Sequence, residues 1–140
     1  MATLRKRVFL VSACLLGLRT RYDGSSKVNP WVKSLKEDTL FIPVCPEQLG
    51  GLPTPRPPAE LFGGDGLGVL EGQAKVILKT GEDVTQNFLK GAYEVLNLAR
   101  LIKIDGALLK ARSPSCGLTP RLGVCAALLL AHGYKVYELD

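Results

Sequence analysis

The sequence is poor in the features on which membrane proteins and common zinc enzymes depend. None of its apolar runs reaches the roughly 18–20 residues that a membrane-spanning helix needs. It contains a single histidine, His132, although metal hydrolases usually bind zinc through histidine. It has no Cys-x-x-Cys pair, so neither a zinc ribbon nor a thioredoxin motif is indicated. We therefore expect no membrane partner and no histidine-activated serine nucleophile.

A complete secretory signal is also missing. The stretch 1–7 is basic and Val8–Ala13 is apolar, but that run is short and no clear cleavage site follows it. We therefore expect a cytoplasmic protein. In a reducing compartment, the four cysteines are more typical of metal binding or thiol chemistry than of disulfides.

Length and charge bound the remaining choices. The chain has 140 residues, of which 46% are hydrophobic, and we expect a single domain spanning 1–140 with a sizeable core. The net charge of +5 permits contact with nucleic acid, but the charged residues are scattered and form no dense patch. Nucleic acid is therefore a less favoured partner, although it stays open.

Apolar runs and helical periodicity alternate along the chain. Strands are predicted at 6–13, 39–44, 106–111 and 134–139. Helices are predicted at 29–36, 83–99 and 123–131. A small β-hairpin is predicted within 61–81. This alternation predicts an α/β fold, a three-layer sandwich around a mainly parallel, Rossmann-like sheet.

Three local expectations concern less regular segments. Five prolines and the Gly50-Gly51 pair predict a stiff, irregular loop over Cys45–Pro58. The glycines of 64–68 predict a turn rather than a nucleotide-binding loop. Asp83, followed by Gln86, resembles a capping box that would begin the longest helix.

Three cysteines each follow a predicted strand: Cys14, Cys45 and Cys116. The carboxyl ends of neighbouring parallel strands converge on one crevice, so these thiols could meet although they are far apart in sequence. Three thiolates could hold zinc or an iron–sulfur cluster, in either case with one coordination position open. Cys125 instead lies in an apolar helix and is interpreted as a buried core residue.

Carboxylate and hydroxyl groups accompany these cysteines. Glu47 lies two residues after Cys45, where it could activate water; the alternative is an ion pair with Arg56 or Arg21. Ser113 and Ser115 could transfer protons or, as serine does more often, cap a turn.

Several motifs, in order along nearly the whole chain, resemble one bacterial family. The matching segments are 12–17, 21–24, 44–47, 50–56, 83–85, Phe88, 91–92 and 113–117. In these segments the chain is similar to the family labelled domain of unknown function 523, whose characterised members are thiouracil desulfidases. One departure is the segment 118–122, which leads straight into the next helix where family members usually carry a longer glycine-rich insert.

The resemblance implies a cofactor and a substrate. It implies that Cys14, Cys45 and Cys116 bind a 4Fe-4S cluster whose fourth iron takes the sulfur of a thiolated pyrimidine, and that aerobic samples can lack the cluster. The implied activity is a carbon–sulfur bond hydrolase that yields uracil and hydrogen sulfide.

The resemblance also implies roles for the neighbouring side chains. Glu47 would activate the attacking water, with Ser113 as the first choice of proton relay and Ser115 as the second. Residues of the shared motif Arg21-Tyr22-Asp23 are predicted to contact the substrate.

Two other hypotheses remain at this point. In the first, the chain is a binding module without turnover, in which arginines recognise an anion or RNA: Arg19, Arg21, Arg56 and Arg112. In the second, it is a plain α/β domain with free thiols.

Overall fold

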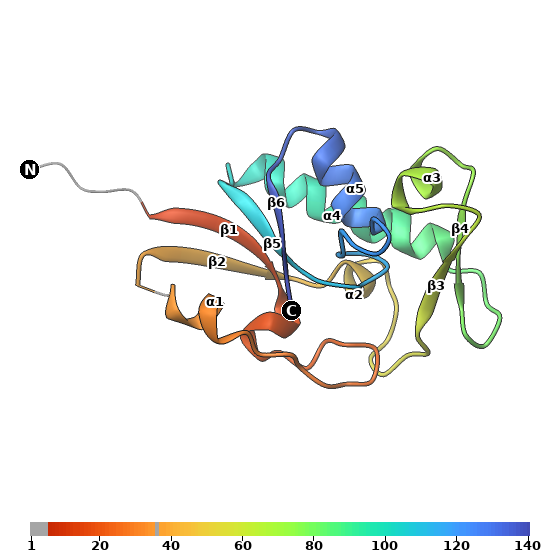
Figure 1. Ribbon diagram of the computed structural model, residues 1–140, viewed down its shortest axis with the longest axis horizontal. Coiled ribbons are helices and arrows are strands. Elements are labelled where there is room, and N and C mark those ends of the chain that lie inside the picture. The colour runs from red at the N-terminus through yellow and green to blue at the C-terminus, as the bar shows by residue number, and fades with distance from the viewer. Residues whose placement is uncertain (1–5, 36) are drawn as a thin grey trace, which may run out of the picture.

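Four parallel strands form the central sheet of the chain (Figure 1). The computed structural model describes residues 6–35 and 37–140. In spatial order the strands are β2 (Thr39–Val44), β1 (Arg7–Ser12), β5 (Gly106–Lys110) and β6 (Val136–Leu139). The predicted parallel sheet is therefore confirmed. Most of the basic N-terminal stretch, 1–5, and the last residue of the first predicted helix, Lys36, lie outside the described residues.

Alternate residues of the middle strands face two separate cores. Leu10 of β1 and Leu109 of β5 pack into the larger core, whereas Val11 and Leu108 pack into the smaller one. The register pairs Val11 with Leu108. A strand that is buried on both faces needs a continuous apolar run, which is why these strands stood out in the sequence.

Helices cover both faces of the sheet and make the predicted three layers. The larger core lies under α4 (Thr85–Leu101) and α5 (Val124–Ala131). The smaller core lies under the short 3₁₀ helix η1 (Ala13–Leu16) and α1 (Pro30–Ser34). Asn29 caps α1 as predicted, because its Oδ1 accepts a hydrogen bond from the Val32 backbone N–H at 3.1 Å.

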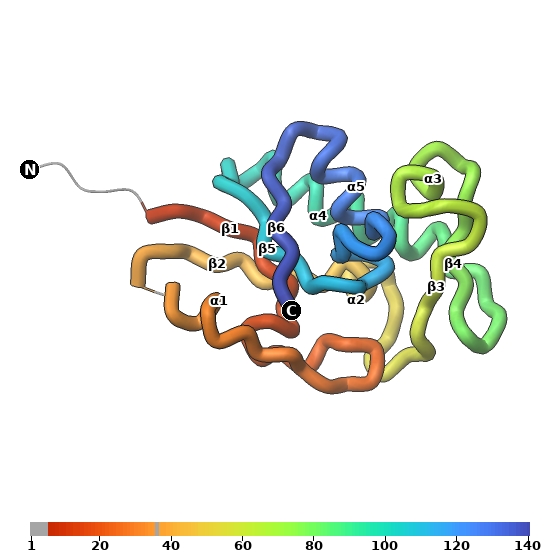
Figure 2. Tube along the Cα trace, viewed as in Figure 1, coloured from red at the N-terminus to blue at the C-terminus, as the bar shows by residue number. Residues whose placement is uncertain are grey.

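The hairpin lies beside the sheet rather than within it (Figure 2). It pairs β3 (Ala59–Phe62) with β4 (Lys75–Leu78) in antiparallel register, which confirms the prediction. The turn predicted at 64–68 is wrong, because α3 (Gly66–Leu70) begins there. Asp65 caps this helix through a hydrogen bond from the Gly68 N–H at 3.0 Å.

Two further expectations are corrected. The segment predicted to be irregular contains the helix α2 (Pro46–Leu49), since proline fits the first helical position, where no N–H is required. The predicted capping box is absent: the cap position of α4 is Val84, and the carboxylate of Asp83 instead accepts hydrogen bonds from the N–H and the hydroxyl of Thr85.

The predicted apolar face of α4 is buried, and α5 is buried along most of its length. Cys125 lies within α5 at 0% exposure, which confirms its interpretation as a core residue. Within the described part of the chain, no helix combines the length and the apolar character that crossing a membrane requires.

Candidate functional site

A pocket of about 380 Å³ opens at the carboxyl edge of the sheet. Its wall includes Cys14 from η1, Cys45 from the end of β2, and Cys116 from the loop after β5. These loops meet because β2, β1 and β5 are adjacent and parallel, so their carboxyl ends lie at one edge. The fold thus brings together three cysteines that span about a hundred positions of the sequence.

All three thiols are free, and each is held in an environment that disfavours the bare thiolate. Burial raises the pKa of Cys14, although the Lys110 charge partly offsets it. Burial likewise raises the pKa of Cys45, and that of Cys116 to about 12. A negative charge on Cys45 further raises the pKa of both other thiols, so the three sulfurs lie within electrostatic reach of one another. Such thiols are poor nucleophiles by themselves, and bound metal would supply the missing positive charge.

The spacing of the donors distinguishes between kinds of metal centre. Among residues 6–35 and 37–140, no three side chains of His, Cys, Asp or Glu lie close enough to surround a single metal ion. A 4Fe-4S cluster places each cysteine on a different iron and therefore suits more widely separated sulfurs. The three donors are all cysteine sulfurs, and this set fits a multinuclear iron–sulfur centre better than one zinc ion.

Glu47 projects from α2 into the same pocket and is held at both carboxylate oxygens. Its Oε1 accepts a hydrogen bond from Arg56 Nε at 2.9 Å, and its Oε2 accepts one from Ser115 Oγ at 3.0 Å. The Glu47 side chain is 13% exposed and that of Arg56 is 3% exposed. The ion pair considered as an alternative for Glu47 is therefore present, and it orients the carboxylate without removing it from the pocket.

Ser113 and Ser115 form a short hydrogen-bonded chain with this carboxylate. Their hydroxyl oxygens lie 3.0 Å apart. Ser113 Oγ also accepts hydrogen bonds from the N–H groups of Ser115 and Cys116, so it caps the turn as well. Ser113, Ser115 and Glu47 thus form a continuous hydrogen-bonded chain at the pocket.

Close backbone packing fixes α2, and with it Glu47. A Cβ added to Gly91 of α4 would lie 1.8 Å from the Pro46 carbonyl oxygen, and one added to Gly50 would lie 2.0 Å from that of Asn87. The Asn87 side-chain amide donates to the Gly50 carbonyl at 2.9 Å. Only glycine at both positions lets the two helices approach this closely.

The loop that carries Ser115 and Cys116 is held by the first turn of α5. The Ser115 carbonyl accepts hydrogen bonds from the N–H groups of Cys125 at 2.8 Å and Ala126 at 3.1 Å. A Cβ on Gly123 would lie 2.5 Å from the Ser115 carbonyl carbon. The unpaired N–H groups of a helix start thus find their acceptors in the functional loop.

Comparison with known proteins decides the family. The family described as 2-thiouracil desulfurase matches residues 9–140. The chain belongs to this family. The resemblance inferred from the sequence motifs is therefore confirmed.

Two relatives of this desulfurase-family chain are similar over most of their length. An uncharacterized protein of Bacillus subtilis (strain 168), YbbK, is 40% identical over 141 residues, which cover 92% of this chain and 93% of that protein. A solved structure of TudS, a 4Fe-4S-dependent thiouracil desulfidase, is 40% identical with a TM-score of 0.78. The match covers 96% of this chain and 92% of that one.

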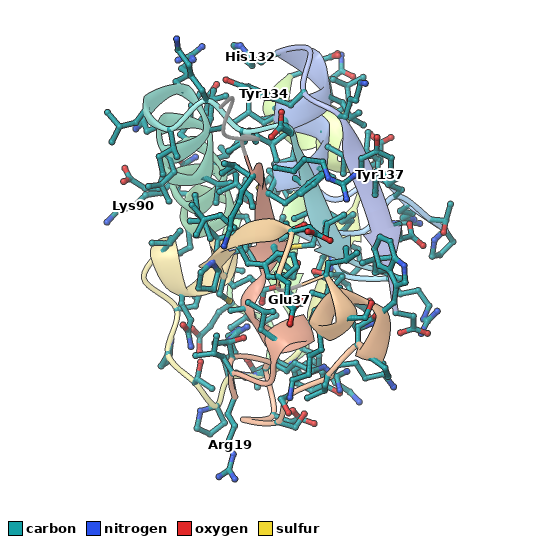
Figure 3. The ribbon with its side chains drawn as sticks, turned by 90° about the vertical axis from the view of Figure 1, so that its left-hand side faces the viewer. Arg19, Glu37, Lys90, His132, Tyr134 and Tyr137 are labelled. Carbon is teal, nitrogen blue, oxygen red and sulfur yellow. The ribbon has the colours of Figure 1, made fainter. Side chains whose placement is uncertain are left out.

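Of the three residues predicted to contact substrate in this member of the 2-thiouracil desulfurase family, two line the pocket and one does not. Arg21 and Tyr22 line the pocket. Asp23 is exposed and does not line it; its Oδ1 accepts hydrogen bonds from the N–H and hydroxyl of Ser25. Arg19, one of the arginines of the binding-module hypothesis, points away from the body of the molecule (Figure 3).

Three charged residues of the pocket wall were not predicted from the sequence of this desulfurase-family chain: Lys27, Lys110 and Asp140. Lys110 Nζ donates to the Ala111 carbonyl and to Asp140 Oδ1, both at 2.9 Å. Hydrogen bonds from Arg112 and Lys110 hold the pKa of Asp140 well below its usual range. The available signal was a lysine at the end of an otherwise apolar strand, since buried lysines generally need a partner.

Proposed function

We propose that the chain is a 4Fe-4S-dependent desulfidase that converts a thiolated pyrimidine such as 2- or 4-thiouracil into uracil and hydrogen sulfide, with residues 1–140 acting as one domain. One observation carries the proposal: three free thiols, a carboxylate and two serine hydroxyls line a single pocket. Family membership and the similarity to TudS support the same substrate class.

Cys14, Cys45 and Cys116 would hold the cluster. They fit it because all three donors are thiols, none is in a disulfide, and their spacing does not suit a single ion. With three protein ligands one iron stays open, and when bound it supplies a Lewis acid that takes the substrate sulfur and polarises the carbon–sulfur bond.

Glu47 would act as the general base. Arg56 orients its carboxylate, and the carboxylate would accept a proton from the water that attacks the ring carbon. The water oxygen becomes the carbonyl oxygen of uracil, both of its protons leave with the sulfur as hydrogen sulfide, and no electrons are transferred.

Ser115 and Ser113 would move protons between the base and the substrate. Ser115 donates to Glu47 and is hydrogen-bonded to Ser113, so a proton collected by the carboxylate can be returned along this chain. Arg21 and Tyr22, which line the same pocket, would contact the pyrimidine.

The test is anaerobic reconstitution with iron and sulfide, followed by measurement of sulfide released from 2-thiouracil and 4-thiouracil. We expect a brown protein that releases sulfide. The Glu47→Gln variant is the matched control, because it should load the same iron while losing turnover. A colourless protein, or a brown one that binds thiouracil without releasing sulfide, would contradict the proposal; the second result would favour the binding module.

A further inference from the structure

The guanidinium of Arg56 is buried and makes more contacts than the ion pair with Glu47 alone. Its side chain is 3% exposed, and it lies in the loop that connects α2 to β3. A charge buried to this extent is tolerated only when its donors are satisfied and an opposite charge is near.

The first three of its N–H groups contact α2 and the loop that follows it. Nε donates to Glu47 Oε1 at 2.9 Å. Nη1 donates to the Thr54 hydroxyl at 2.8 Å and to the Pro53 carbonyl at 3.3 Å. These contacts fix the guanidinium plane relative to the carboxylate.

The remaining two donors contact the loop that precedes α1 and the cysteine at the start of α2. Nη2 donates to the Thr20 carbonyl at 3.0 Å and to Cys45 Sγ at 3.9 Å. The Arg56 N–H also donates to the Tyr22 carbonyl at 2.7 Å, so the loop before α1 and the loop after α2 lie side by side (Figure 2). All five donors of the guanidinium thus have an acceptor.

We propose that Arg56 is a positioning residue that couples the base to the metal site: one guanidinium aims the Glu47 carboxylate and donates a hydrogen bond to the Cys45 sulfur. This inference rests on the proposed function, since it gives Glu47 and Cys45 the roles assigned there. A planar fork suits this task, because it directs donors to two acceptors in fixed directions.

The coupling has two measurable consequences. A hydrogen bond and a positive charge at a ligating sulfur favour the reduced state of an iron–sulfur cluster, so Arg56 raises its reduction potential. The hydrogen bond from Arg56 to Oε1 directs the other oxygen of Glu47, Oε2, toward Ser115. Loss of Arg56 should therefore lower kcat and leave substrate binding unchanged.

The experiment compares Arg56→Gln and Arg56→Lys in the reconstituted, cluster-loaded protein. Arg121→Gln is the matched control, because it removes the same charge from a guanidinium that donates to a backbone carbonyl, that of Leu61, at 2.6 Å. The readouts are the midpoint potential by anaerobic dye titration, kcat and KM for 2-thiouracil, and the melting temperature.

For Arg56→Gln we expect a more negative potential, an unchanged KM and a kcat lower by about 10- to 100-fold. This fold-change corresponds to the loss of one charge-assisted hydrogen bond. Arg56→Lys should recover part of the potential but not kcat, because an ammonium lacks the fork. Arg121→Gln should match the wild type in potential, kcat and KM.

Other outcomes overturn the inference. An unchanged potential in Arg56→Gln, equal shifts in Arg121→Gln, or full kcat in Arg56→Lys would each show that Arg56 serves only to hold the loops. If Arg56→Gln does not fold, the same comparison is decided by Arg56→Lys. Failure of the loaded wild type to release sulfide would sink the proposed function instead, while the potentials would still test the contact with Cys45.

Discussion

The two halves of the pocket are held by different means. The half that contains Cys45 and Glu47 is fixed by side chains, chiefly the buried Arg56, and by the contact of α2 with α4 across glycine. The half from Ser113 to Cys116 is fixed by backbone hydrogen bonds, which connect its carbonyls to the first turn of α5.

This difference separates two demands on the site. The general base proposed above needs an orientation and a charge environment that individual side chains can set, and Arg56 and Ser115 give the Glu47 carboxylate its orientation. The proposed relay of hydroxyls beside Cys116 needs a fixed backbone. The first turn of α5 supplies it through hydrogen bonds to backbone carbonyls, without a buried charge. We therefore expect the loss of a hydroxyl in the second half to leave its backbone in place, and a change in the close packing of the first half to displace Glu47.

The largest effect should come from the cysteines, and it should be equal in both halves. Cys45→Ser and Cys116→Ser are each expected to abolish stable cluster binding, because each removes one of three ligands. Iron content and visible absorbance after anaerobic reconstitution measure this. Cys125→Ala is the control and should keep its iron, since Cys125 lies in the core and does not line the pocket. If either ligand variant loads normally, the two halves do not share one centre.

The next effect should come from Gly91→Ala, which places a Cβ 1.8 Å from the Pro46 carbonyl oxygen. We expect a loss of about 2–3 kcal/mol in the free energy of unfolding, as for overpacked cores, together with lost sulfide release. Urea denaturation measures the first quantity. The neighbouring Lys90→Ala is the control, because Lys90 points outward from α4 (Figure 3). Equal stability of the two variants would show that close packing does not hold the Glu47 half.

Ser115→Ala tests the half from Ser113 to Cys116 by removing a single hydroxyl. It removes the hydroxyl that donates to Glu47 but leaves the backbone contacts of Ser115 to α5. We expect kcat to fall on the order of tenfold while the melting temperature stays nearly constant. A large drop in melting temperature would instead mean that the hydroxyl belongs to the frame.

The smallest effect concerns the segment that follows Gly117. The Glu138 carboxylate accepts hydrogen bonds from the N–H groups of Leu118 at 2.7 Å and Thr119 at 2.8 Å. Burial by itself raises the pKa of Glu138, but hydrogen bonds from Thr119 and Leu118 and the charge of Arg112 outweigh it and leave the pKa below its ordinary value.

A lowered folded-state pKa means that this stabilisation is present above the ordinary pKa and is lost as the pH falls through the lowered one. At pH 7 we expect Glu138→Gln to be less stable by about 1 kcal/mol, and the gap to close between roughly pH 5 and 3. Thermal melts of both proteins across this range test it. A gap that does not depend on pH would show that the charge is irrelevant there.

Much of the frame could be predicted because the apolar runs of parallel strands leave a clear sequence signal. The strands β1, β2 and β5 are nearly continuous apolar runs, and parallel order then places Cys14, Cys45 and Cys116 at one edge. Neither step needs knowledge of side-chain contacts.

The parts that escaped prediction depend on contacts between distant segments. The helices α2 and α3 span only four and five residues, too short to show periodicity, and their glycines and prolines resemble those of loops. A Cβ on Gly66 would lie 2.3 Å from the Gly123 carbonyl oxygen, so this glycine is required by a neighbour far along the chain rather than by a turn. Arg56 was considered from the sequence only as an ion-pair partner of Glu47 or an anion-binding residue, since its other acceptors become visible only in three dimensions.

The position of β5 next to β1 determines when, during folding, the three cysteines can come together. Cys14 and Cys45 follow strands that are close in sequence, whereas Cys116 takes its place only after β5 has paired with β1 across nearly a hundred residues. A nascent chain that stops short of β5 offers two thiols and no third. If the three thiols hold the proposed cluster, iron and sulfide can therefore be inserted only after the sheet has assembled.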